Sequence, residues 1–196
     1  NIILFFNYGQ RTLLQEKRYA RKCAKDIKAR FKEVKLLWLK DISNSLLNKK
    51  IKLSKIKNLK NTKKESDRLY VPGRNTAFLI YAISLIESLN KNYDIFTGFK
   101  CEGKESYPDT TKEYVNAMNK LIKVSTNIKS RIIAPLINKD KDEIILLGKK
   151  LGVNFSNTYS CYNGSRKHCG YCLACKLRQA GFYWANLKDP TRYKNL

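Results

Sequence analysis

Residues 2–39 read IILFFNYGQRTLLQEKRYARKCAKDIKARFKEVKLLWL, and they place two short apolar runs on either side of a longer amphipathic segment. The uninterrupted apolar run over residues 2–6 predicts a buried strand, which ends at the turn residues of positions 7–9. Apolar residues then recur at helical spacing over 10–31, and residues 34–39 predict a second strand. A strand, a helix and a strand of these lengths form a βαβ unit, whose two strands run parallel.

The alternation of strands and helices continues along the chain. Helices are predicted over residues 74–89, 109–124, 140–151 and 175–187, and strands over 94–98 and 131–134. This order predicts an α/β fold over residues 1–156, a Rossmann-like open parallel sheet with helices on both faces, followed by a metal-binding segment and C-terminal helix over residues 157–196. The lysine-rich stretch 49–68 has no clear periodicity, and we expect a solvated insertion or mobile loop there.

The composition is that of a globular protein with a large excess of basic residues. The 196 residues are 43% hydrophobic, and 40 Lys and Arg against 16 Asp and Glu give a net charge of +24. The excess is mostly lysine spread along the whole chain, so direct nucleic-acid binding is not favoured although the charge permits it. No stretch reaches the roughly 18 consecutive apolar residues of a membrane span, and the run over residues 2–6 is too short for a signal peptide. We therefore expect a cytoplasmic protein.

Four cysteines, Cys161, Cys169, Cys172 and Cys175, lie within fifteen residues of one another in a glycine-containing segment. Thiolates are favoured structural ligands of Zn²⁺, which takes four of them in a tetrahedron. A C-x2-C pair forms a tight turn whose two sulfurs can face one ion. The pattern predicts one structural zinc, which can contribute on the order of 10 kcal/mol to the folding of a segment that is too small for its own core.

Two other interpretations of these cysteines stay open. Three of them match part of a bacterial iron–sulfur motif, although the fourth lies upstream and the x3-C-P that should follow is missing. Unliganded or disulfide-bonded cysteines are the other alternative, which a cytosolic setting disfavours. His168 adjoins one ligand and could replace it, but four cysteines already complete a tetrahedron. Cys23 and Cys101 are interpreted as small buried apolar residues or bystanders.

Short motifs across nearly the whole chain occur in the order of one known family. They are Tyr8-Gly9-Gln10-Arg11, Val71-Pro72-Gly73-Arg74-Asn75, Thr97-Gly98, Tyr107-Pro108-Asp109, Ala134-Pro135-Leu136, Ser160-Cys161-Tyr162-Asn163-Gly164, Cys169-Gly170-x-Cys172-x2-Cys175, Leu177-Arg178 and Gly181-Phe182. With these motifs the chain resembles the 7-cyano-7-deazaguanine synthase (preQ0 synthase, QueC) family, a zinc-containing branch of the PP-loop ATP pyrophosphatase superfamily. The resemblance implies an adenine nucleotide hydrolase-like α/β fold with a C-terminal zinc-binding segment.

The resemblance also implies an activity and a set of site residues. The activity is that of an ATP-dependent carbon–nitrogen ligase in queuosine or archaeosine tRNA-modification biosynthesis, which converts 7-carboxy-7-deazaguanine and ammonia to the nitrile preQ0, with Mg²⁺ on the ATP. A homodimer is the family's habit. By the same resemblance Arg74 and Asn75 line the crevice at the carboxyl ends of the strands. Asp109 accepts ring N–H groups of the deazaguanine, and Tyr8 and Gln10 are weaker substrate-binding candidates. A helix cap or a loop salt bridge is the alternative role for Arg74, Asn75 and Asp109.

The sequence departs from the family at the ATP site. The family's Ser-Gly-Gly-x-Asp-Ser loop, whose backbone N–H groups surround the phosphates, does not occur in residues 1–196. In the family this loop precedes the strand that corresponds to residues 2–6. We therefore expect this sequence to be a fragment, or the product of a broken gene, that does not bind ATP productively by itself. Thr110 and Thr111 also stand where the family often has Cys and Arg, and Thr12 stands where His is common.

Two alternative functions stay open at this level. Another zinc-containing PP-loop tRNA-modifying protein, such as a thiolation enzyme, would need redox-active cysteines outside the zinc set, and Cys23 and Cys101 are poorly placed for that role. A basic zinc module would instead bind RNA through the lysine-rich residues 49–64.

Overall fold

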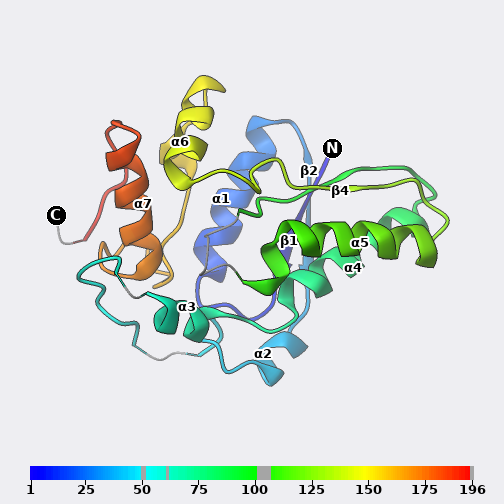
Figure 1. Cartoon of the computed structure of the whole chain (residues 1–196), viewed down its shortest axis with the longest axis horizontal. Helices are drawn as coiled ribbons and strands as arrows, with labels where there is room; N and C mark the ends of the chain where they lie inside the picture. The colour runs from blue at the N-terminus through cyan, green and yellow to red at the C-terminus, as the bar shows by residue number, and fades with distance from the viewer. Residues whose placement is uncertain (50–51, 61, 101–106, 195–196) are drawn as a thin grey trace. The chain divides into compact units, whose positions relative to one another are not determined.

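In the computed structural model of the protein, which describes residues 1–49, 52–60, 62–100 and 107–194, helices alternate with short parallel strands (Figure 1). With η for 3-10 helices, the elements are β1 (Ile2–Asn7), α1 (Leu13–Asp26), β2 (Arg30–Lys35), α2 (Trp38–Ile42), α3 (Lys63–Leu69), α4 (Arg74–Ser88), β3 (Ile95–Phe96), η2 (Pro108–Thr110), α5 (Lys112–Ser125), β4 (Ile132–Ile133), α6 (Lys141–Lys150), η3 (Phe155–Asn157) and α7 (Leu173–Trp184). The described strands form two two-stranded parallel sheets, β1–β2 and β3–β4. The α/β class is therefore confirmed, whereas one open sheet with helices on both faces stays a prediction.

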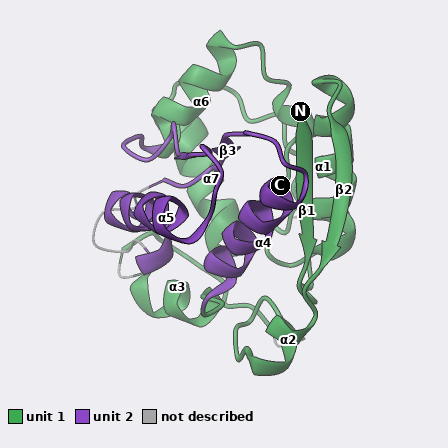
Figure 2. Ribbon diagram, turned by 90° about the vertical axis from the view of Figure 1, so that its right-hand side faces the viewer, with its two compact units in different colours: residues 1–72, 141–196 green, residues 73–140 purple. Residues whose placement is uncertain are grey.

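The described residues divide into two compact units, residues 1–72 with 141–196 and residues 73–140 (Figure 2). The chain leaves the first unit after residue 72 and returns to it at residue 141. The division at residue 156 between an α/β domain and a metal-binding segment stays a prediction. Among the residues that the structure describes, no helix is both long enough and apolar enough to cross a lipid bilayer.

The βαβ unit predicted from the first residues is present in the first unit. The register of β1 and β2 pairs Ile2 with Arg30 and Asn7 with Lys35, both strands running in the same direction. Helix α1 packs against both strands and buries Ala24 (Figure 1). The loop that follows β1 therefore begins at the carboxyl end of the strand pair, the end at which parallel sheets usually bind ligands.

The second strand lies earlier in the chain than predicted. The sequence predicted it over 34–39, but β2 spans Arg30–Lys35, and α2 takes up part of the apolar run. Leu39 is fully buried from α2, whereas Trp38 on the same helix is half exposed. A short apolar run carries no periodicity that separates helix from strand, and the charged Glu33 interrupts the apolar pattern of the true strand.

The lysine-rich stretch 49–68 is only in part the solvated loop that the sequence predicted, because residues 52–60 are irregular and mostly exposed whereas its end lies in helix α3. Its described part ends in helix α3, and Leu53 and Leu69 are buried. Ser45 Oγ donates a hydrogen bond to the carbonyl oxygen of Leu69 at 2.8 Å. Residues 50, 51 and 61 lie outside the described residues. The few apolar side chains of this stretch pack into the core and anchor it to the fold. The lysines, which dominate its composition, gave no sign of this packing.

The second unit is built from α4, α5 and the β3–β4 pair. Its core includes Leu79 of α4, Ile122 of α5 and Ile132 of β4. Helix α5 begins at Lys112, three residues after the predicted start at 109, and Thr111 Oγ1 caps it by accepting a hydrogen bond from the backbone N–H of Tyr114 at 3.1 Å. This cap fixes the start of α5 directly after η2, the short helix that carries a candidate site residue.

Helices α6 and α7 pack side by side in the first unit (Figure 1). Ile145 of α6 and Phe182 of α7 are buried in a small core of their own. The last helix was predicted over 175–187 and begins slightly earlier, so Cys172 is its N-cap residue and Cys175 lies in its first turn. The start of α7 thereby fixes the positions of two of the four cysteines, Cys172 and Cys175.

Candidate metal centre and buried carboxylate

Four cysteine side chains converge at the start of α7. Cys161 and Cys169 lie in the segment between η3 and α7, and Cys172 and Cys175 lie at the start of the helix. None of the four is more than 2% exposed. Their Sγ atoms all lie within 4.8 Å of one another. The structure thus brings together the four thiols that the sequence singled out.

The spacing of the sulfurs fits a tetrahedral ion better than a disulfide. A tetrahedron with Zn–S distances of about 2.3 Å has edges of about 3.8 Å, and Cys169 Sγ lies 3.9 Å from Cys175 Sγ. A disulfide would bring two sulfurs to about 2.05 Å of each other, and all four cysteines are free. The donor set can therefore hold a metal ion, and it suits zinc.

Backbone N–H groups stabilise negative charge on these sulfurs. Those of Asn163 and Cys169 donate to Cys161 Sγ at 3.4 and 3.3 Å, and that of Cys172 donates to Cys169 Sγ at 3.4 Å. Hydrogen bonds from the other three thiols lower the pKa of Cys169, whereas contacts with Cys161, Cys169 and Cys172 raise the pKa of Cys175. The four groups thus compete for negative charge, and a divalent cation would relieve that competition by allowing all four to ionise.

His168 supports the cluster without joining the ligand set. Its Nε2 accepts a hydrogen bond from the backbone N–H of Ser160 at 3.2 Å, and its ring lies against Tyr159 with centroids 4.7 Å apart. Burial, together with the charge of Arg178, lowers the pKa of His168 to about 4, so the imidazole is neutral near neutral pH. Because its Nε2 is already engaged, the cysteines complete the metal site by themselves.

A second group of candidate residues lies at the N-terminus of α4. Gly73 caps this helix in the left-handed conformation, with φ at +66°, and Arg74 and Asn75 are its first residues. Arg74 Nε donates to Asn75 Oδ1 at 3.2 Å, and Asn75 Nδ2 donates to the carbonyl oxygen of Asp109 at 3.4 Å. The structure therefore brings Arg74, Asn75 and Asp109 together within the second unit.

Asp109 is a buried carboxylate whose oxygens receive no well-formed hydrogen bond from the described residues. Its exposed fraction is 6%, and within the part of the chain that the structure describes neither carboxylate oxygen is hydrogen-bonded. Burial raises the pKa of Asp109 above its usual range, although the charge of Arg74 and the N–H groups of Asn75 oppose this shift. A buried acceptor without a donor costs free energy, so its presence is typical of a site built for the donor groups of a ligand.

The sequence model of the family "Queuosine biosynthesis protein QueC" matches residues 2–186 of this chain. The chain belongs to the QueC family. The 7-cyano-7-deazaguanine synthase of Methanothermobacter thermautotrophicus is 33% identical over 192 residues, which cover 96% of this chain and 86% of that protein. The protein of the same name from Rickettsia bellii is 36% identical over 192 residues, with 96% and 84% covered. That of Methanosphaera stadtmanae is 35% identical over 194 residues, with 96% and 85% covered.

Two of the motifs that carried the QueC resemblance meet in the structure. Arg11 Nη2 donates to Asn163 Oδ1 at 3.2 Å. Gly164 has a φ of +73°, and a Cβ there would clash with the carbonyl oxygen of Arg11. The loop from Cys161 to Gly164 therefore docks on the turn after β1. Because the two partners are 152 residues apart, the turn-forming Asn-Gly pair is the single local sign of this contact in the sequence.

Tyr8 and Gln10 of the QueC motif are buried in that same turn. Gln10 Oε1 accepts a hydrogen bond from the N–H of Tyr8 at 3.0 Å, and its Nε2 donates to the carbonyl oxygen of Phe6 and to Glu16 Oε2 at 3.0 and 3.1 Å. Asn48 Nδ2 donates to the carbonyl oxygen of Tyr8 at 2.9 Å. The Gln10 amide thus holds the turn, and a substrate contact by either residue stays a prediction.

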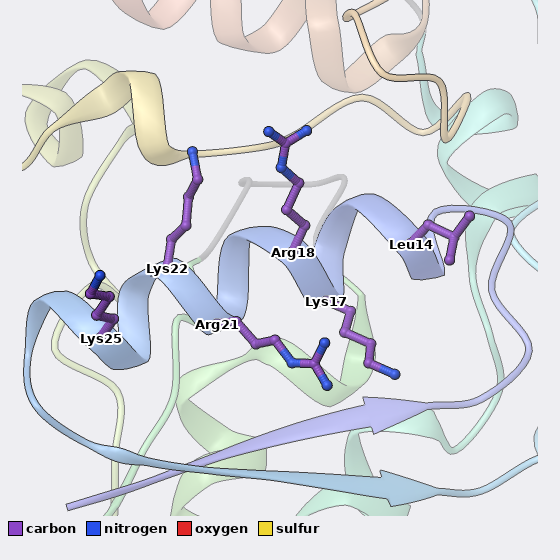
Figure 3. Close-up of a pocket in the computed structure, with 6 residues that line it drawn as sticks. All are labelled: Leu14, Lys17, Arg18, Arg21, Lys22 and Lys25. Atoms are coloured by element: carbon purple, nitrogen blue, oxygen red, sulfur yellow. The ribbon is translucent and has the colours of Figure 1, made fainter.

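A hollow along α1 is lined by basic side chains, but these side chains do not converge on one point as they would in a polyanion-binding site. It is lined by Leu14, Lys17, Arg18, Arg21, Lys22 and Lys25. Lys17 and Arg21 point toward the strands, where Lys17 pairs with Glu33 at 2.6 Å and Arg21 lies 5.2 Å from the Phe31 ring centre, whereas Arg18 and Lys22 extend to the opposite side (Figure 3). Because the side chains diverge (Figure 3), this hollow does not form one basic site, and the RNA-binding alternative, which rests on residues 49–64, stays a prediction.

Of the two remaining cysteines, Cys23 lies within the described residues. Cys23 is exposed on α1 and is not the buried apolar residue that one interpretation expected. Cys101 lies outside the described residues, so its assignment stays a prediction.

Proposed function

We propose that this chain, in a form that carries the family's ATP-binding loop, serves as a 7-cyano-7-deazaguanine synthase, an ATP-dependent ligase that makes preQ0 from 7-carboxy-7-deazaguanine and ammonia for queuosine or archaeosine biosynthesis. The observation that carries the proposal is the QueC family match over residues 2–186. Relatives with that enzyme name support it, because the alignments cover 84–86% of their length. The buried, unpartnered carboxylate in the second unit adds a candidate substrate contact.

The chemistry requires activation of the substrate carboxylate. Hydroxide is too poor a leaving group for ammonia to displace, so ATP first converts a carboxylate oxygen into a leaving group. Ammonia then displaces it to form an amide, and a second activation removes the amide oxygen to leave the nitrile. Mg²⁺ would offset the charge of the triphosphate. The residues that bind ATP and Mg²⁺ are not assigned in residues 1–196, where the Ser-Gly-Gly-x-Asp-Ser loop does not occur, and we expect residues 1–196 alone to be inactive.

We assign substrate recognition to the residues at the start of α4 and to η2. Asp109 supplies two buried acceptor oxygens, which match the adjacent N–H donors on the edge of a guanine-like ring. Asn75 can contact the edge of the same ring, and Arg74 suits the carboxylate or a phosphate. A ligand with paired N–H groups would remove the cost of the unpartnered carboxylate, and this gain favours such a ligand over an analogue without the donors.

The four-cysteine site would hold one zinc ion in a structural role. Cys161, Cys169, Cys172 and Cys175 all donate sulfur, so the coordination shell would be closed and no position would remain for substrate. Bound zinc would supply a cross-link within the segment between η3 and α7, which also contacts the turn after β1 through Asn163. Iron–sulfur ligation is the alternative, and metal analysis with an absorption spectrum separates the two.

Binding of 7-carboxy-7-deazaguanine to residues 1–196 tests the substrate assignment by titration calorimetry. Asp109→Asn should weaken binding about tenfold or more, because a charge-assisted hydrogen bond contributes roughly 1.5–3 kcal/mol. Asp41→Asn is the matched control, since Asp41 is exposed on α2, and it should leave the affinity unchanged. Equal affinity of the Asp109→Asn protein and the unaltered chain would remove Asp109 from the site.

Turnover tests the activity itself. The assay contains 7-carboxy-7-deazaguanine, ammonia and MgATP, and mass spectrometry follows the amide and the nitrile. It is run on residues 1–196 and on the same residues preceded by a segment that carries Ser-Gly-Gly-x-Asp-Ser. Nitrile from the loop-bearing form is the expected result. Failure of that form to make either product, together with salt-sensitive tRNA binding, would favour the RNA-binding alternative instead.

We also propose a cytoplasmic homodimer, which rests on the family resemblance alone. Light scattering at several protein concentrations tests the oligomeric state. A molar mass that stays at the 22.8 kDa of one chain would contradict the dimer.

A further inference from the structure

The last described residues lie against the cysteine cluster. We call residues 189–194 the strap. Tyr193 forms a parallel bridge with His168, and the N–H of Lys194 donates to the carbonyl oxygen of His168 at 2.8 Å. A Cβ at Gly170 would lie 3.5 Å from Tyr193 Cδ1, in ordinary contact. The strap therefore touches the residues on both sides of Cys169, whose exposed fraction is 0%.

One carboxylate holds the strap in this position. Both oxygens of Asp189 accept from Arg178 Nε at 3.2 Å. Asp189 also accepts from the N–H of Thr191 at 3.0 Å and from the Tyr193 hydroxyl at 2.6 Å. The carboxylate thus joins helix α7 to both the middle and the end of the strap, and the hydrogen bond to Tyr193 fixes the ring that covers Gly170.

The cation that holds this carboxylate is itself fixed. Arg178 is 8% exposed and lies one turn after Cys175 on α7. Its Nη1 donates to Thr158 Oγ1 at 2.8 Å, and its Nη2 donates to the carbonyl oxygen of Phe155 at 3.3 Å. Its guanidinium is therefore tied to η3 and to the residue that follows it, so the strap is attached to a rigid part of the first unit and not to a mobile side chain.

We propose that the strap is a closure over the metal centre, and that Asp189 and Tyr193 set the rate at which the bound ion leaves without supplying a ligand to it. Removal of an ion from four thiolates requires a competing ligand to reach the ion or a proton to reach a sulfur atom. The strap covers the side of the cluster at Cys169, so opening of the strap precedes that attack. This inference rests on the proposed metal site and does not depend on the proposed synthase reaction.

Zinc release from the zinc-loaded chain tests the closure. Excess 4-(2-pyridylazo)resorcinol removes the ion, and its absorbance gives the release rate. Asp189→Asn and Tyr193→Phe should each release zinc about tenfold faster, because the loss of a charge-assisted hydrogen bond shifts the opening equilibrium by about 1.4 kcal/mol. Tyr183→Phe is the matched control, since Tyr183 is 74% exposed on α7, and its release rate should equal that of the unaltered chain.

Tyr193→Phe keeps the ring and removes one hydroxyl, so it decides the question if Asp189→Asn fails to fold. Release rates within twofold of the unaltered chain for Tyr193→Phe would overturn the proposal. If the chain takes up no zinc, the same variants are compared by the alkylation rate of Cys169 in the reduced protein, with the exposed Cys23 as internal reference. Faster alkylation of Cys169 in the variants supports the closure, and unchanged alkylation overturns it. Neither readout involves turnover, so a failure here is distinguishable from a failure of the synthase assignment.

Discussion

The cysteine cluster and the Asp109 site are both buried, but they differ in how well their negatively charged groups are hydrogen-bonded. Around the cysteines, backbone N–H groups donate to Cys161 and Cys169 Sγ, and the neighbouring Asp189 carboxylate accepts from three residues. At the other site, both oxygens of Asp109 lack a hydrogen bond among the described residues. A site whose negatively charged groups receive internal donors stabilises the fold, whereas a site with a spare buried carboxylate is suited to bind a ligand.

The electrostatic consequences differ in the same way. Burial alone would raise the pKa of Asp189, but hydrogen bonds from Tyr193 and Thr191 and the charge of Arg178 outweigh it and hold that pKa below its usual range. Burial raises the pKa of Asp109, and the charge of Arg74 and the N–H groups of Asn75 offset that rise only in part. An ionised Asp189 therefore stabilises the folded state near neutral pH, while an ionised Asp109 destabilises it.

Removal of one of the four cysteine ligands should have the largest effect on stability. A small effect would contradict the view that the cysteine region stabilises the fold. Cys172→Ser is expected to abolish zinc binding and to cost a large part of the ~10 kcal/mol that a structural zinc contributes, so the segment from Cys161 to the strap should lose its hydrogen-exchange protection. Cys23→Ser is the control, because Cys23 is exposed on α1, and it should change neither zinc content nor protection. Full protection in the Cys172→Ser protein would show that packing alone holds this region.

A pair of glycine substitutions sharpens the view that the cysteine region is tightly fitted. Gly164→Ala should cost roughly 3 kcal/mol, because it adds backbone strain at φ +73° to a clash with Arg11. Gly152→Ala has a similar φ of +70° but open space around its Cβ, so it should cost only about 1 kcal/mol. Denaturant unfolding gives both values. Equal losses of stability for the two variants would mean that the loop from Cys161 to Gly164 does not pack closely against the turn after β1.

Neutralisation of Asp109 tests the unsatisfied site through the pH dependence of stability. Because its folded-state pKa is raised, the unfolded chain loses the proton first, and stability falls as the pH rises from about 3.9 through the folded-state pKa. Asp109→Asn should therefore be more stable than the unaltered chain by roughly 1–2 kcal/mol at about pH 7, the cost of a buried charge without a partner, and equal to it at about pH 3. Thermal unfolding at both pH values measures this.

The exposed Asp41→Asn variant provides the reference for that experiment, and it should show no comparable gain near neutral pH. An Asp109→Asn protein that is less stable than the unaltered chain at about pH 7 would mean that the carboxylate already has a partner. The contrast between the two regions would then disappear.

The smallest expected change in stability concerns the N-cap of α5, the helix that follows the Asp109 site. Thr111→Ala removes the cap that accepts from the Tyr114 N–H, and it should cost about 1 kcal/mol in thermal unfolding. Ser125→Ala at the other end of α5 is the control, since its hydroxyl donates only to the carbonyl oxygen of Leu121, and its effect should be close to zero. A loss at Ser125 as large as that at Thr111 would show that the cap does not specifically fix the start of α5.

Local patterns predicted the elements that depend on nearby residues. The strand over residues 2–6 and the helix of α4 follow from apolar runs and helical periodicity, and the structure confirms them. The bounds of the second strand and the end of the stretch 49–68 were predicted wrongly for a shared reason. In both, burial of a few side chains such as Leu39 and Leu53 overrode the composition of the surrounding residues.

The amino-acid sequence alone was enough to identify the QueC family and to select the four cysteines, because thiol chemistry and short spacings are properties of neighbouring residues. Folding decided that Asp109 is buried without a partner, that Gly164 packs on Arg11, and that Tyr193 closes over Gly170. Two of these features bring together residues that are distant in the chain, and the third depends on the lack of a well-formed hydrogen bond to Asp109 from the described residues. No local periodicity records them, since burial and pairing are set by how the elements pack in three dimensions.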